Sequence, residues 1–135
     1  MFYEYAPIRN IYNSIQKDVE KLSVIAPINI KNEIQSSWEK IISSENELNK
    51  YFNLYEKNIF INFEMAAENV IELLKNIQQN ILNFKGIIEK NKSINLNLAT
   101  NIHDSINKIV SENDNQIEVW QKRLSQYIEA GCIPA

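Results

Sequence analysis

The sequence contains very little glycine, proline, cysteine or histidine. Of its 135 residues, two are glycine, three proline, one cysteine and one histidine. A single cysteine excludes an intrachain disulfide framework, and one cysteine with one histidine supplies too few ligands for a structural zinc site. Two glycines cannot build the glycine-rich turns that hold phosphate groups or form oxyanion holes. We therefore expect no catalytic residues, no metal and no cofactor, and predict that the protein is not an enzyme.

Membrane-spanning and nucleic-acid-binding patterns are also lacking. No apolar run approaches the ~18 residues that would cross a bilayer, and the N-terminus has none of the basic and apolar regions of a secretory signal. The 17 acidic and 14 basic residues are mixed along the chain, which has a formal charge of −3. No basic stripe is present that would displace counterions from phosphates. These observations predict a cytoplasmic protein that does not bind nucleic acid.

The dominant positive feature is a long stretch with helical periodicity. Between Pro27 and Gly86 the chain has no proline and no glycine. Apolar residues recur there every three or four positions, which places them on one face of an α-helix. Those that follow this spacing are Leu48, Phe52, Tyr55, Ile59, Phe63, Ala66, Val70, Leu73, Ile77, Ile81, Phe84 and Ile88.

The helix boundaries are predicted from local signals. Pro27 ends the first helical pattern because the residue before a proline is pushed out of the α region. Ser44 and Glu47 have the spacing of a capping box, so a turn is expected near Ser43–Ser44. Gly86 can act as a C-terminal cap. The alternative is that the helix continues to Lys90 and contains Gly86 at a cost of roughly 1 kcal/mol.

Together these boundaries predict a single all-α domain over residues 1–135. We expect an elongated bundle of three long helical arms, 7–43, 45–86 and 93–130. The first arm is kinked at Pro27, so the bundle has three to four helices. Residues 1–6 form an N-terminal segment and residues 132–135 a tail.

Asn113 lies on the apolar stripe of the last arm, within a polar run over residues 111–116. A single buried asparagine can fix the register or the oligomeric state of a helical bundle. Alternatively, residues 111–116 form a polar loop that interrupts the arm, or Asn113 lies at a frayed surface. The sequence leaves these interpretations open.

The region from residue 51 to residue 65 has more apolar side chains than one stripe requires. Tyr51, Leu54, Ile61 and Met65 form a second row, and Phe60 lies on a further side. A helix between two neighbours needs a wide apolar face, which explains part of this excess. Aromatic residues and methionine are also enriched at interfaces. We therefore predict that Tyr51, Leu54, Phe60, Ile61 and Met65 bind a partner.

Residues 46–131 resemble a phasin, one of the small helical proteins that coat polyhydroxyalkanoate granules. The resemblance rests on Asn62-Phe63-Glu64-Met65-Ala66-Ala67 followed by Val70-Ile71-Glu72, within two long glycine-poor helices. Phasins are typically rich in alanine, whereas this chain is rich in isoleucine and asparagine. The resemblance implies an amphipathic coat on an apolar granule.

Taken together, the sequence predicts a non-enzymatic helical binding or scaffolding protein. We expect it to act through amphipathic helices, with a protein partner or as a homo-oligomer. One alternative is a phasin-like coat of an apolar granule or lipid surface, on which the bundle would open. Another is a small inhibitor or immunity-type protein.

Overall fold

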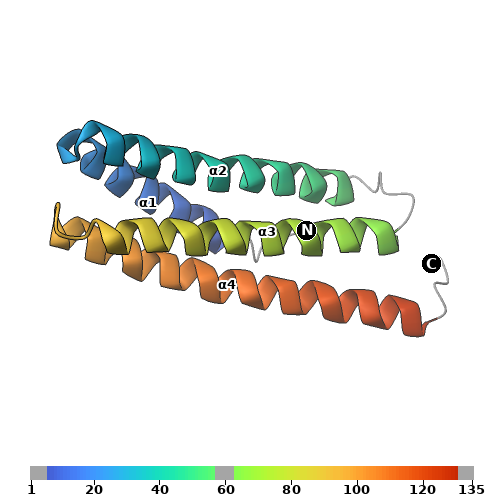
Figure 1. Ribbon diagram of the computed structural model, residues 1–135. Coiled ribbons are helices and arrows are strands. Elements are labelled where there is room, and N and C mark those ends of the chain that lie inside the picture. Colours follow the sequence, from blue (N-terminus) through green and yellow to red (C-terminus); the bar gives the residue numbers. More distant parts are fainter. Residues whose placement is uncertain (1–5, 57–62, 131–135) are drawn as a thin grey trace.

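The computed structural model describes residues 6–56 and 63–130. Within them the chain forms four α-helices and no strand: α1 (Ala6–Ile25), α2 (Ile28–Glu56), α3 (Phe63–Lys90) and α4 (Leu96–Glu129). Successive helices run in opposite directions, and their main contacts form a ring in which α1 also packs against α4 (Figure 1). The predicted all-α, elongated bundle is confirmed.

The chain reverses direction at Pro27 instead of only bending there. α1 ends at Ile25 and α2 begins at Ile28. The amide of Ala26 still donates to the carbonyl of Leu22 (3.0 Å), and the carbonyl of Pro27 accepts the first bond of α2 from the amide of Lys31 (2.8 Å). The first predicted arm is therefore a helical hairpin, and the bundle has four helices.

The turn expected near Ser43–Ser44 is wrong, because α2 continues from Ile28 to Glu56 without interruption. Serine and glutamate are tolerated inside a helix, and the buried positions Ile41, Glu45 and Leu48 keep the helical spacing across this point. The reversal lies instead between Glu56 and Phe63, since α2 and α3 are antiparallel neighbours (Figure 1). The predicted arm over 45–86 is thus divided between α2 and α3.

The other predicted boundaries agree better with the structure. α3 continues past Gly86 to Lys90, which is the second of the two alternatives. The chain then turns over residues 91–94 and starts α4 at Leu96. α4 has 34 residues and is about 51 Å long at a rise of about 1.5 Å per residue. It runs through residues 111–116, so the polar run is not a loop, and Asn113 is buried.

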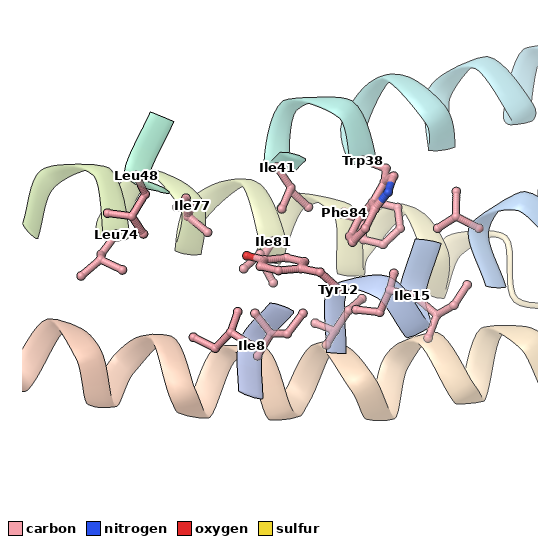
Figure 2. Packing of buried hydrophobic residues seen from close by; sticks show 14 of the residues in the cluster. Ile8, Tyr12, Ile15, Trp38, Ile41, Leu48, Leu74, Ile77, Ile81 and Phe84 are labelled. Atoms are coloured by element: carbon pink, nitrogen blue, oxygen red, sulfur yellow. The ribbon is translucent and has the colours of Figure 1, made fainter. Parts of the chain in front are cut away.

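The core is formed mainly by isoleucine and leucine from all four helices. In the part of the bundle that α1 covers, three aromatic rings connect three helices (Figure 2). Tyr12 of α1 lies 5.8 Å from Trp38 of α2, and Trp38 lies 5.3 Å from Phe84 of α3, measured between ring centroids. Such tilted ring pairs contribute about 0.5–1.5 kcal/mol each beyond the area they bury. The side chains at the centre of the bundle are Ile8, Ile15, Leu22, Ile34, Ile41, Leu48, Leu74, Ile77, Ile81, Ile88, Ile102, Ile106 and Ile109.

α1 is shorter than the other helices and covers only part of the bundle. It has 20 residues, against 29 in α2, 28 in α3 and 34 in α4. The half of the bundle that holds the α1–α2 turn therefore has four helices, whereas the described residues of the other half belong to α2, α3 and α4 only (Figure 1).

Candidate binding surface

Large aliphatic side chains are exposed at one end of the bundle. Val24 is 84% exposed, Ile28 69% and Ile25 49%, and Pro27 between them is also exposed. Leu96, at the start of α4, is 62% exposed. The α1–α2 and α3–α4 turns lie at the same end (Figure 1). We call these five residues the apolar tip: Val24, Ile25, Pro27, Ile28 and Leu96.

Local hydrogen bonds hold the α3–α4 turn in place at this end of the bundle. The side-chain amide of Asn91 donates to the carbonyl of Ile87 (2.9 Å), which satisfies an end group of α3. The side chain of Asn95 accepts from the amide of Leu98 (3.0 Å) and caps the N-terminus of α4. Leu96 is the first residue after this cap, so the backbone fixes its position at the end of the bundle.

The fold does not require apolar residues at these turns. A two-residue connection between helices is usually formed by glycine, asparagine, serine or proline, and the core stripe of α1 ends with Leu22. Exposed apolar side chains that lie next to one another on a protein surface are typical of interaction sites. The other large exposed hydrophobic side chains among the described residues are separate from the tip: Met65, Leu82 and Ile128.

The predicted partner-binding residues do not form one row on one helix. Tyr51 belongs to α2, where it is half-buried and packs against the core. Met65 belongs to the antiparallel helix α3 and is 62% exposed. The side chain of Leu54 and the whole of Phe60 and Ile61 lie outside the described residues. Their role in binding a partner stays a prediction.

The end of the bundle opposite the tip contains an aromatic cluster. Phe63 stacks on Trp120 with 6.2 Å between ring centroids and contacts Tyr127 at 5.1 Å. The guanidinium of Arg123 lies 5.4 Å from the centre of the Trp120 ring, within the range of a cation–π interaction. These contacts join the start of α3 to the end of α4. They lie beyond the part of the bundle that α1 covers.

A polar cleft separates α1 from α2. Two hollows of about 400 and 430 Å³ lie along it and share the lining residues Gln16, Ile42 and Asn46. Trp38 donates from its indole nitrogen to the side-chain oxygen of Gln16 across the cleft. Arg9 donates to Asn49 over 2.8 Å. The contact between these two helices therefore includes two side-chain hydrogen bonds beside the hollows.

Glu45 is the buried acid of this cleft. Burial raises the pKa of Glu45 to about 7, against the opposing effects of the Arg9 charge and of a hydrogen bond with Asn49. Burial, and to a smaller extent the Glu45 charge, also raise the pKa of Tyr12. The Tyr12 hydroxyl and the Ser23 hydroxyl are buried without a hydrogen-bond partner. The cleft thus contains polar groups that weaken the packing of α1.

The single histidine does not organise a site. His103 is half-buried, and its Nδ1 lies 3.4 Å from the side-chain nitrogen of Asn107. Across residues 6–56 and 63–130 no three His, Cys, Asp or Glu side chains gather as metal ligands would.

Sequence reasoning missed the apolar tip. In the run Val24-Ile25-Ala26-Pro27-Ile28, the proline indicates a helix boundary, but no local pattern indicates a binding surface. The composition of this run is the feature that could have indicated an exposed apolar surface. Three branched aliphatic residues flank the proline, although polar residues would form the turn equally well. Periodicity cannot show which apolar residues lie beyond the end of a core stripe.

The fold defines a four-helix bundle of alternating up and down helices. Comparison of the chain with family models, curated proteins and solved structures found no match.

None of the described helices has a segment of sufficient length and hydrophobicity to traverse a lipid bilayer.

Proposed function

We propose that this chain is a non-enzymatic helical binding protein that attaches to an apolar target surface through the apolar tip. The observation that carries the proposal is the exposure of Val24, Ile28 and Leu96 by more than 60% each at one end of the bundle. Burying such a side chain fully is worth about 1.5–3 kcal/mol. Two or three of them acting together are enough for reversible attachment.

The packed core beneath the tip supports attachment by the tip. The core beneath it, including Leu22, Ile34 and Ile88, is at most 2% exposed. The tip residues therefore need no rearrangement to meet a target, which avoids the cost of ordering a flexible segment on binding.

Adsorption of the purified chain to octyl-coated beads tests this proposal. The double variant Val24→Ser/Ile28→Ser removes the two most exposed side chains of the tip. We expect it to adsorb at least about tenfold more weakly than the parent, from the transfer free energies above. Leu82→Ser is the matched control, because Leu82 is 44% exposed on α3 and lies outside the tip.

The variant Met65→Ser tests whether the partner-binding residues predicted from the sequence, which include Met65, bind the beads instead of the tip. If Met65→Ser abolishes adsorption and the double tip variant does not, the binding surface lies at the opposite end. Equal adsorption of all four proteins would contradict the proposal. Circular dichroism and thermal melting must show that every variant remains folded.

A coat for an apolar granule or lipid surface, in which the bundle opens, is the second candidate. The polar cleft between α1 and α2 favours it, because the hollows and unpartnered hydroxyls there loosen the packing of α1 against α2. Opening would expose the apolar face of α1, including Ile15 and Val19. A disulfide engineered between α1 and α2 would block granule binding by this route and leave attachment by the tip intact.

A further inference from the structure

Charge is distributed unevenly along the bundle. The two segments that form and flank the turns at the apolar tip, residues 21–32 and 90–103, contain four lysines and no aspartate or glutamate. The lysines are Lys21, Lys31, Lys90 and Lys92. All 17 acidic residues and only ten of the 14 basic residues belong to the remainder of the chain. The charged side chains closest to the turns at the apolar tip are therefore lysines.

From this juxtaposition we infer that the apolar tip inserts into the surface of an anionic phospholipid bilayer. The inference rests on the proposed function and names its target. Val24, Ile25, Ile28 and Leu96 would enter the boundary between headgroups and acyl chains. The lysines around them would remain among the lipid phosphates, because a lysine stem can lie along apolar material while its ammonium stays in water.

The charged residues nearest the tip are lysines. Glu20, Glu33, Glu89 and Asp104 immediately flank the two segments, and each of them lies further along its helix from the turn than the lysines of that segment. Glu89 pairs with Lys92 over 2.9 Å, so this lysine is partly neutralised. Lys21 and Lys90 are exposed, and Lys31 is half-buried at the first turn of α2. Each lysine close to an anionic membrane strengthens binding by about fivefold.

Charge complementarity favours lipid over a second copy of the chain. In a tip-to-tip dimer the same lysines would face one another across the contact, which is repulsive. An anionic bilayer has negatively charged headgroups above an apolar layer of acyl chains. The lysines would meet the headgroups, and the aliphatic side chains would meet the acyl chains.

Flotation of the full chain with lipid vesicles tests the inference. One vesicle preparation contains equal parts of phosphatidylglycerol and phosphatidylcholine, and the other contains phosphatidylcholine alone. We expect the chain to float with the anionic vesicles, to dissociate as salt is raised, and to bind the neutral vesicles at least about tenfold more weakly.

Two variants separate the apolar and the charged contributions. Val24→Ser/Ile28→Ser should reduce flotation with anionic vesicles at least about tenfold. Lys21→Gln/Lys31→Gln should reduce it by about tenfold or more and make the remainder less sensitive to salt. Lys50→Gln/Lys75→Gln is the matched control, because both lysines are exposed on α2 and α3 away from the tip. It should float like the parent.

The possible failures are distinguishable. If the chain adsorbs to octyl beads through the tip but does not float with anionic vesicles, the inference is wrong and the proposed function stands. Equal flotation with neutral and anionic vesicles would likewise contradict the inference and leave the proposed function in place. Failure in both assays overturns both. A dimer that depends on Val24 and Ile28 in light scattering, without vesicle binding, would assign the tip to a second copy and overturn the lipid inference.

Discussion

Asn113 of α4 donates a hydrogen bond from its side-chain nitrogen to the backbone carbonyl of Leu74 in α3, over 2.9 Å. The same nitrogen lies 3.2 Å from the side-chain oxygen of Gln78, and the side-chain nitrogen of Gln78 donates to the carboxylate of Asp114 over 2.8 Å. Asn113 is 1% exposed. A slip of α4 along α3 would leave this amide without a partner, so the contact fixes the register of these two helices.

Replacing Asn113 by aspartate should destabilise the bundle by about 3 kcal/mol at neutral pH. The new carboxylate would face the Leu74 carbonyl and the Gln78 oxygen, which are both acceptors, in a buried position. The effect should shrink toward pH 5, since burial raises the pKa of the new acid and its protonated form can again donate. Urea denaturation of the parent and Asn113→Asp at pH 5 and pH 8 measures both effects.

Asn115→Asp is the control for this prediction. Asn115 is exposed on the same helix two residues further on, so its substitution should change the free energy of unfolding by less than about 0.5 kcal/mol. An equal loss in both variants would mean that added negative charge on α4, and not the buried contact, controls stability.

Glu45 should make the bundle less stable as the pH rises from about 4.5 to 7. Burial raises the pKa of Glu45 to about 7 in the folded chain, whereas an unfolded glutamate has a pKa near 4.3. Between these values the folded state holds a proton that the unfolded state has lost, so raising the pH removes stability. Allowing for solvent screening, we expect the loss to be about 1–2 kcal/mol.

Glu45→Gln tests the origin of this pH dependence. The variant should match the parent near pH 4.5 and exceed its free energy of unfolding by about 1–2 kcal/mol above pH 7, because glutamine carries no charge to bury. Glu47→Gln, at an exposed position of α2, should keep the slope of the parent. A Glu45→Gln variant with the parental pH profile would show that another group causes it.

The apolar periodicity predicted most of the core because it depends only on local spacing. Ile77, Ile81, Phe84 and Ile88 were placed on one face of a helix from their spacing, and each is at most 1% exposed. Asn113 was recognised as an exception on such a face, but spacing alone could not choose between a buried contact and a loop. The buried contact forms because the amide of Asn113 meets the carbonyl of Leu74, which lies 39 positions away in the sequence.

The reversal between α2 and α3 was not predicted, because residues 57–62 contain neither glycine nor proline. A capping box at Ser44 and Glu47 was the stronger local signal, but tertiary packing of Ile41 and Leu48 into the core overrides it. The apolar tip was missed for a related reason. The exposure of Val24 and Ile28 depends on where the neighbouring helices end, which no local pattern contains.

Asn95→Ala should cost about 1 kcal/mol of stability. The Asn95 side chain accepts from the Leu98 amide over 3.0 Å and satisfies one of the free donors at the start of α4. Alanine cannot supply this acceptor. Thermal melting of Asn95→Ala should show the loss, whereas Asn97→Ala, exposed in the first turn of the same helix, should melt at or slightly above the parental temperature because alanine favours the helix. A neutral Asn95→Ala would show that water caps the helix as well as the side chain does.

Gly86→Ala should stabilise the bundle by about 0.5–1 kcal/mol. Gly86 is exposed in the interior of α3, and a methyl group built on its α-carbon meets no atom within 4 Å. Alanine therefore gains helix propensity and restricts the unfolded chain without a steric cost. Gly86→Ser should gain less than Gly86→Ala, because serine competes for backbone hydrogen bonds. Urea denaturation of the three proteins measures this order. A loss of stability in Gly86→Ala would contradict the prediction, since nothing in the bundle itself opposes the added methyl group.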